Sequence, residues 1–296
     1  MRNLVKLLIV PLLAFFSCSQ QIDGIWEEKE IPQEPGVHPV SVRFSKADVE
    51  GFVGEGISEV GIYVYMSDSL VYGKTLSLDG SNLEIPLPLG ENLQTFAVAN
   101  ADELVDVDSL SKVIIYQHDN MQKPVYISEI TGFTSDNSVS TLTLELKRLV
   151  GQAVFQPKES DEEMDAVTNF DALDITFTNV GIGYKVKSKE CILGNVTVRT
   201  DRNNGFSASV YSFPTFDTGS LTSINVVYLK NSEEVNRLVG VLDTGISFVP
   251  SKRSTVHMDF LNEDFLDVPW NVKTRTVRMM HEGKSEQPFT ILESEF

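Results

Sequence analysis

Apolar and polar residues alternate with a period of two along most of the chain after residue 40. In residues 60–66 the aliphatic side chains fall on one side of an extended chain, and Tyr63 and Tyr65 fall on the other. Residues 141–147 carry a leucine at every second position. Because successive side chains of a β-strand point to opposite faces, this period predicts strands. Further strands are predicted at residues 40–44, 83–89, 95–99, 125–130, 150–155, 174–178, 196–199, 223–229, 246–249 and 256–261.

Turn-forming residues separate the predicted strands. Asp79-Gly80 and Asn204-Gly205 combine residues that tolerate positive φ, as tight hairpin turns require. A short helix is predicted only around residues 110–116. The sequence therefore predicts an all-β fold, and many short strands at this spacing are typical of β-sandwiches.

The N-terminus has the three parts of a bacterial export signal. Arg2 and Lys6 supply positive charge, and residues 7–16 form an apolar run that is too short to span a bilayer as a helix. The following Phe-Phe-Ser-Cys, which ends at Cys18, resembles the lipobox of bacterial lipoproteins, in which the cysteine thiol receives lipid and becomes the first mature residue. An ordinary signal peptide with a chance cysteine is the alternative. We predict that Cys18 is the lipid-attachment site.

Changes in composition and in strand pattern divide the rest of the chain. The stretch that follows Cys18 is polar and contains three prolines, so it is interpreted as a tether. One run of strands ends before Arg148 and another begins after it, and charged residues increase towards the C-terminus. The predicted parts are a signal peptide (1–17), a tether (18–39), an N-terminal β-sandwich (40–147), a C-terminal β-sandwich (148–262) and a C-terminal extension (263–296).

The charge of the chain excludes some classes of partner. With 24 basic and 42 acidic residues the formal net charge is −18, whereas nucleic-acid binding needs a basic face. The same charge argues against broad electrostatic adhesion to anionic lipid, so membrane attachment is expected through acyl chains on Cys18. If Cys18 carries lipid, Cys191 has no cysteine partner within the chain, and it is predicted to be a small buried apolar residue.

No arrangement of residues indicates catalysis or a bound metal. The four histidines, at positions 38, 118, 257 and 281, lack the spacing of a zinc site, and neither a phosphate-binding glycine loop nor a Gly-x-Ser-x-Gly motif is present. The acidic residues 161–165 are interpreted as a solvated loop in preference to a calcium site. Tyr63 and Tyr65 are expected to pack between sheets in preference to forming a binding surface. We predict no catalytic residue, no metal, no cofactor and no enzyme activity.

Three segments resemble the fimbrillin family, the subunits of type V pili. The segment LPLGENLQTFAVAN (residues 87–100) ends in the alanine–asparagine pair common in that family. LTLELKRLVG (residues 142–151) is similar to the family's passage into the second domain, and FVPSKRSTVHMD (residues 248–259) to the last strand of that domain. The order and spacing of the three segments carry the resemblance.

The resemblance implies a fold and a role. The fold is two transthyretin-like β-sandwich domains in tandem, and the role is assembly of a fimbria at the outer membrane. Stalk subunits of this family are cut after an arginine, which removes the first strand and opens a groove for a neighbour's C-terminal strand. Anchor subunits keep their first strand and their lipid. The first arginine after Cys18 is Arg43, inside a predicted strand, which favours an uncleaved, anchor-type subunit.

The C-terminal extension contains short alternating apolar patterns around Val277, Met279, Phe289 and Ile291. Such a segment has too few neighbours for a core of its own, which is what a donated strand requires. We predict that these four residues contact a neighbouring subunit. The alternative is that the segment folds back on the chain's own second sandwich.

Three functions remain compatible with the sequence. The preferred one is an outer-membrane lipoprotein that anchors or terminates a fimbria by strand exchange with a stalk subunit. Within the binding class, the alternatives are a stalk or tip fimbrillin that acts as an adhesin, and a glycan-binding surface lipoprotein. The third function is a hydrolase whose site the sequence does not reveal. The sequence identifies neither the partner subunit nor a receptor.

Overall fold

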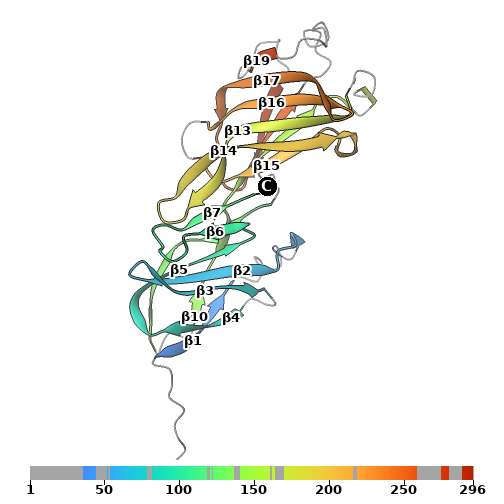
Figure 1. Cartoon of the computed structure of the whole chain (residues 1–296). Helices are drawn as coiled ribbons and strands as arrows, with labels where there is room; N and C mark the ends of the chain where they lie inside the picture. Colours follow the sequence, from blue (N-terminus) through green and yellow to red (C-terminus); the bar gives the residue numbers. More distant parts are fainter. Residues whose placement is uncertain are drawn as a thin grey trace, which may run out of the picture. The chain divides into compact units, whose positions relative to one another are not determined.

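The computed structural model divides the chain into two units, Met1–Pro35 and Gly36–Phe296, and the residues that it describes all belong to the second (Figure 1). The described residues are 36–44, 52, 54–78, 82–118, 121, 123–136, 141–160, 162–163, 170–215, 219–258, 275–279 and 289–295, with the backbone alone for 241–244, 275–279 and 289–295. Most of them lie in strands, so the all-β prediction is confirmed.

Two sheets form the first sandwich. The smaller sheet has three strands in the order β10-β1-β4, and the larger has the order β11-β8-β5-β2-β3 with β9 also paired to β5. The strands are β1 (Val37–Arg43), β2 (Glu59–Met66), β3 (Ser69–Ser77), β4 (Asn82–Pro88), β5 (Gly90–Ala99), β8 (Tyr126–Ser128), β9 (Thr131–Ser135), β10 (Thr141–Thr143) and β11 (Leu146–Arg148).

Alternating apolar residues of both sheets make the core of the first sandwich. Val40 and Val42 of β1 are fully buried, and so are Ile62 and Val64 of β2. These side chains belong to one cluster with residues of β4, β5 and β10. Burial of such side chains is the main stabilising term of the fold, at about 1.5–3 kcal/mol for each large aliphatic residue.

Two more sheets form the second sandwich. One has the order β15-β12-β18-β20, and the other has the order β19-β17-β16-β13-β7-β6 with β14 also paired to β13. The strands are β6 (Glu103–Val105), β7 (Ile114–Tyr116), β12 (Gly151–Pro157), β13 (Ala172–Lys185), β14 (Glu190–Asp201), β15 (Ala208–Ser212), β16 (Leu221–Lys230), β17 (Glu233–Ile246), β18 (Lys252–Met258), β19 (Arg275–Met279) and β20 (Phe289–Glu295).

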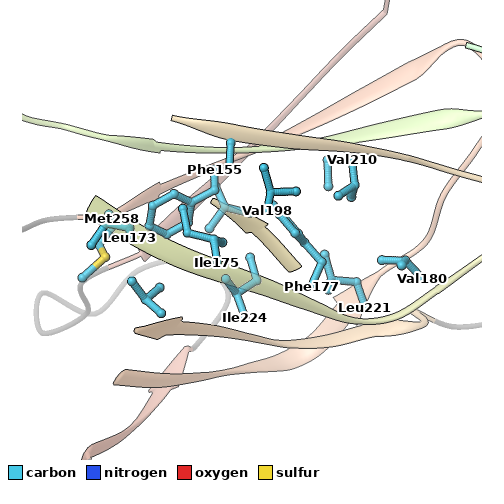
Figure 2. Close-up of a cluster of buried hydrophobic side chains, with 14 of the residues drawn as sticks. Phe155, Leu173, Ile175, Phe177, Val180, Val198, Val210, Leu221, Ile224 and Met258 are labelled. Atoms are coloured by element: carbon cyan, nitrogen blue, oxygen red, sulfur yellow. The ribbon is translucent and has the colours of Figure 1, made fainter. Parts of the chain in front are cut away.

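The second core lies between these two sheets (Figure 2). Phe155 of β12 packs in one cluster with Ile175 and Phe177 of β13 and with Ile224 of β16, all fully buried. The long strands β13 and β16 carry the alternating pattern that the sequence predicted there. Their inward residues fill the space between the sheets, and their outward residues are partly exposed.

The two sandwiches are joined by strands that precede the predicted domain boundary. Strands β6 and β7 lie before Arg148, yet β7 pairs with β13, and Tyr116 lies opposite Gly183. A third apolar cluster packs residues from both sandwiches together, including Tyr65, Phe96, Ile115 and Phe213. The division at residues 147 and 148 falls within β11, and separate folding of the two halves remains a proposal.

Several local predictions differ from the structure. The predicted helix at residues 110–116 is wrong, because this segment is a turn followed by β7, whose backbone groups pair with β13. Residues 141–147 are interrupted at Leu144 and Glu145, so that β10 pairs with β1 whereas β11 pairs with β8. The strand predicted at residues 246–249 begins where β17 ends.

Asn204-Gly205 forms a turn but not a hairpin. Gly205 has a φ of 58° and ends a short 3-10 helix, Arg202–Asn204, so the predicted turn chemistry is present. The strands on either side, β14 and β15, belong to different sheets, and the turn therefore crosses the sandwich. Asp79-Gly80 lies outside the described residues, although β3 and β4 on either side of it also belong to different sheets.

Candidate functional site at the strand edges and the sandwich junction

Strand β1 is the central strand of its sheet. It pairs in parallel with β10, where Val42 lies opposite Leu142, and antiparallel with β4, where Val42 lies opposite Leu83. Because β1 lies between two partners, its removal would leave unpaired backbone groups on both β10 and β4 and would open the core at Val40. Unpaired strand edges of this kind are templates for the addition of another strand.

The four C-terminal residues predicted to contact a neighbour lie on two different sheets of the second sandwich. Strand β19 pairs in parallel with β17, which places Val277 opposite Gly240 and Met279 opposite Leu242. Strand β20 pairs antiparallel with β18, which places Phe289 opposite Met258 and Ile291 opposite Val256. Both strands end the strand order of their sheets.

Other predicted site residues lie outside the described part of the chain. Cys18 and residues 18–35 of the predicted tether belong to the unit Met1–Pro35, whereas residues 37–39, also predicted as tether, lie in β1. The acidic residues 161–165 are described only at Glu162 and Glu163. Within the described residues, no group of three or more histidine, cysteine, aspartate or glutamate side chains could hold a metal ion. In that same part, no helix is long and apolar enough to cross a bilayer.

The tyrosines of β2 pack as predicted. Tyr65 is fully buried, and Tyr63 and Tyr65 stack on Phe96 with ring centroids 5.3 and 6.1 Å away. Burial raises the pKa of both phenols. Strand β2 is therefore buried on both faces, because its aliphatic residues fill the first core and its tyrosines face the junction.

Cys191 is half-buried in the same region. Its Sγ occupies the space that a side chain on Gly181 would need, so a glycine is required at position 181. Burial raises the pKa of the thiol to about 11, which keeps it protonated at neutral pH. An unreactive thiol that fills space agrees with the predicted apolar role.

Ion pairs connect loops of the two sandwiches. Lys187 and Lys189 lie in the turn between β13 and β14, and their Nζ atoms are 3.5 Å from Asp68 Oδ1 and 2.9 Å from Glu129 Oε2. Asp68 also accepts hydrogen bonds from the hydroxyls of Ser109 and Ser111, which lower its pKa to about 2. These groups are partly exposed, so the apolar contacts of the junction contribute more to its stability than the ion pairs do.

Glu55, Tyr126 and Arg148 form a hydrogen-bonded group at the end of the first sandwich. Tyr126 Oη donates to Glu55 Oε2 at 2.5 Å, and Arg148 Nη2 donates to Glu55 Oε1 at 2.6 Å and to Tyr126 Oη at 2.9 Å. The Arg148 guanidinium also lies 5.5 Å from the centroid of the Tyr126 ring. Burial, and then the hydrogen bond to Glu55, raise the pKa of Tyr126 to about 12.

Sequence reasoning missed this group because its members are distant along the chain. Arg148 stood out only as part of the segment that opens the second domain, and Glu55 and Tyr126 carried no motif. Their contact depends on the pairing of β11 with β8, which places Arg148 opposite Tyr126. The alternation of polar and apolar residues predicts strands but not which strands are neighbours.

Comparison with known proteins establishes the fold but no family. No protein-family model matches the sequence, and no curated protein matches it significantly. Among solved structures, a candidate cell adhesion protein from Bacteroides eggerthii is 11% identical with a TM-score of 0.53, and the match covers 88% of this chain and 96% of that one. A candidate adhesin from Bacteroides ovatus is 12% identical with a TM-score of 0.50, covering 92% of this chain and 99% of that one.

A fimbrial assembly protein from Parabacteroides distasonis is also similar, at 12% identity and a TM-score of 0.44, with 75% of this chain and 91% of that one covered. A score below 0.5 does not establish a common fold, so the first two similarities are the informative ones. At such low identities a similarity shows the fold alone. This chain therefore has the fold of those two Bacteroides proteins.

Proposed function

We propose that the protein is a fimbrial subunit that is held at the bacterial outer membrane by acyl chains on Cys18 and joins a stalk subunit by β-strand exchange. The observation that carries the proposal is the edge position of both C-terminal strands. β19 and β20 end the strand orders of the two sheets of the second sandwich. The fold, shared with candidate adhesion proteins, and the three fimbrillin-like segments support it.

Strand donation has a direct physical basis. A donated strand satisfies unpaired backbone groups on the receiving sheet, and its alternate side chains fill the receiving core. We propose that the segment containing Val277, Met279, Phe289 and Ile291 leaves β17 and β18 and pairs with the subunit above. The edge strands can exchange because each is held by one neighbouring strand, whereas β1 is held by two.

The position of the first arginine after Cys18 supports an anchor in preference to a stalk subunit. Residues 19–42 contain no arginine, and Arg43 is the last residue of β1. Its backbone is paired on both sides, opposite Asn82 of β4 and Thr143 of β10. A protease that cuts after arginine needs an accessible extended segment, so we propose that β1 and the lipid remain on the mature protein.

Truncation of residues 270–296 tests strand donation. We expect the truncated protein to remain folded, with a cooperative thermal transition, and to lose its attachment to the stalk subunit in a pull-down. The full-length chain is the control in both assays. A truncated chain that fails to fold would assign these residues to the chain's own sandwich. A folded truncated chain that still binds the stalk subunit would place the contact elsewhere.

In the adhesin alternative the protein has the same fold but does not lie at the base of the fimbria. A stalk or tip subunit would lose β1 and the lipid during assembly, whereas an anchor keeps both. Mass spectrometry of the N-terminus of the cellular protein distinguishes them: a diacylated or triacylated Cys18 supports the anchor, and an N-terminus at residue 44 supports a processed subunit.

A further inference from the structure

An open groove of about 1170 Å³ is lined by residues of both sandwiches. Strands β8 and β11 contribute to it from the first sandwich, and β15 and β18 from the second. Its volume slightly exceeds the range of about 300–1000 Å³ that is usual for small-ligand sites. No function derived from strand exchange uses this groove.

The first sandwich supplies an aromatic ring with a guanidinium over it. Tyr126 and Arg148 are opposite each other on β8 and β11, and Arg148 donates to the Tyr126 hydroxyl and to Glu55. The Arg148 side chain is 15% exposed, so its carboxylate partner and the Tyr126 ring hold it in place. This wall is fixed before any ligand arrives.

The second sandwich supplies a row of three side chains across three strands. Gln152 of β12 lies opposite Tyr211 of β15 on one side and Arg253 of β18 on the other. Arg253 Nε donates to Gln152 Oε1 at 2.8 Å, which orients the guanidinium, and Arg253 is exposed on the groove. Tyr211 is half-buried and lines the same groove.

The charge of the groove differs from that of the whole chain. Lys147, Arg148 and Arg253 line it together with Glu55 and Glu145, so cations outnumber carboxylates there, whereas the chain has a net charge of −18. An isolated cationic spot within an acidic protein attracts a single carboxylate and disfavours a dense polyanion, because the surrounding carboxylates repel further negative charge. This charge pattern favours a ligand whose negative charge is localised.

We propose that this groove binds an oligosaccharide in which one carboxylated sugar is flanked by neutral sugars. The planar guanidinium of Arg253 matches a carboxylate with two parallel hydrogen bonds. The ring of Tyr211, which is half-buried on the groove, suits the apolar C–H face of a sugar ring, and the Glu55 carboxylate can accept from sugar hydroxyls. Arg253 lies on β18 opposite Ser294 of β20, so the site borders one of the strand edges, and it adds a receptor-binding function to assembly.

Titration of the purified mature protein with defined sugars tests the proposal. The probes are 3′-sialyllactose and a disaccharide that contains one glucuronic acid, followed by saturation-transfer NMR; lactose is the neutral control and heparin the polyanion control. We expect at least one carboxylated probe to bind with a Kd of about 1 mM or lower, and lactose and heparin to bind about tenfold more weakly or not at all.

Variants of residues that line the groove assign the binding to it. We expect Arg253→Ala to weaken binding about tenfold or more, and Arg253→Lys to weaken it less, because lysine keeps the charge but loses the bidentate geometry. Tyr211→Ala should also weaken binding. Arg237→Ala, which removes a guanidinium paired with Glu234 outside the groove, is the matched control and should bind as the parent does. An unchanged melting temperature shows that each variant is folded.

Four results would overturn the proposal. They are no binding of either carboxylated probe at about 10 mM, equal binding of lactose, tighter binding of heparin, and full binding by a folded Arg253→Ala variant. Tighter heparin binding would identify a polyanion site. Capture of a protein subunit by the groove, lost in Arg253→Ala without any sugar binding, would identify a protein contact.

Discussion

Leu144 gives a sharp test of how the first sandwich is built. Its side chain is 1% exposed and packs in the core with the valines of β1, whereas its neighbour Thr143 is exposed at the end of β10. The Leu144 backbone N–H donates to the Arg43 carbonyl at 2.9 Å, so the residue marks the point where the chain leaves one sheet for the other. Adjacent positions should therefore respond very differently to the same substitution.

The expected loss of stability follows from the burial of the Leu144 side chain. Leu→Ala at a fully buried site costs about 2–5 kcal/mol, because the lost apolar contacts add to the cavity left behind. Each kcal/mol lowers Tm by roughly 2–4 °C in a protein of this size. We expect Leu144→Ala to lower Tm by roughly 6–12 °C for a cost of about 3 kcal/mol. Leu144→Asp buries an unpaired carboxylate and should prevent soluble expression, whereas Thr143→Asp should be tolerated.

Differential scanning calorimetry on matched preparations measures the melting temperatures of the variants at positions 143 and 144. Thr143→Asp controls for the added charge and Leu144→Ala for the lost volume. If Leu144→Asp and Thr143→Asp melt at the same temperature, the inward and outward assignment of residues 143 and 144 is wrong. The pairing of β10 with β1 would then also have to be revised.

Three further predictions concern charge and attachment. Arg148→Ala should lower the free energy of unfolding, measured by urea denaturation, by about 1–2 kcal/mol, and Arg199→Ala should lower it less, because the Arg148 side chain is 15% exposed and that of Arg199, paired with Asp174, is 59% exposed. Cys18→Ala should release the protein from the membrane fraction with an unchanged melt; pelleting with outer membranes after a carbonate wash would contradict acyl anchoring. Hydrogen bonds hold the pKa of Asp68 at about 2 in the folded chain, below its value in the unfolded chain. The Asp68 carboxylate therefore stabilises the fold at a pH above its unfolded-state pKa, and this stabilisation is lost as the pH falls through 2. The melting temperatures of Asp68→Asn and the parent should differ at pH 6 and converge at pH 2.

The sequence predicts most strands because their alternation reflects one buried face. β1, β2, β13 and β16 were predicted from this pattern, and their inward residues are buried. The helix prediction fails at residues 110–116, where Leu110, Val113 and Ile115 pack into the junction from a turn and a short strand. Tertiary pairing with β13 decides the conformation there.

The candidate sites were less predictable than the fold. The edge position of the C-terminal strands agrees with an apolar pattern visible in the sequence, but which sheets they join depends on pairings between distant segments. The groove was not predictable, because Tyr126, Arg148, Tyr211 and Arg253 come from four strands of two sandwiches. Only sheet order and register bring their side chains together.

Photo-crosslinking from position 291 in living cells tests the central claim most directly. Ile291 lies opposite Val256 in β18 of the same chain, and the proposed function requires it to move to a neighbouring subunit. With p-benzoylphenylalanine at position 291, we predict a crosslink to a second fimbrial subunit, identified by mass spectrometry, that disappears when the stalk subunit is deleted. A crosslink found only within the chain, to β18, in assembled fimbriae would contradict strand donation.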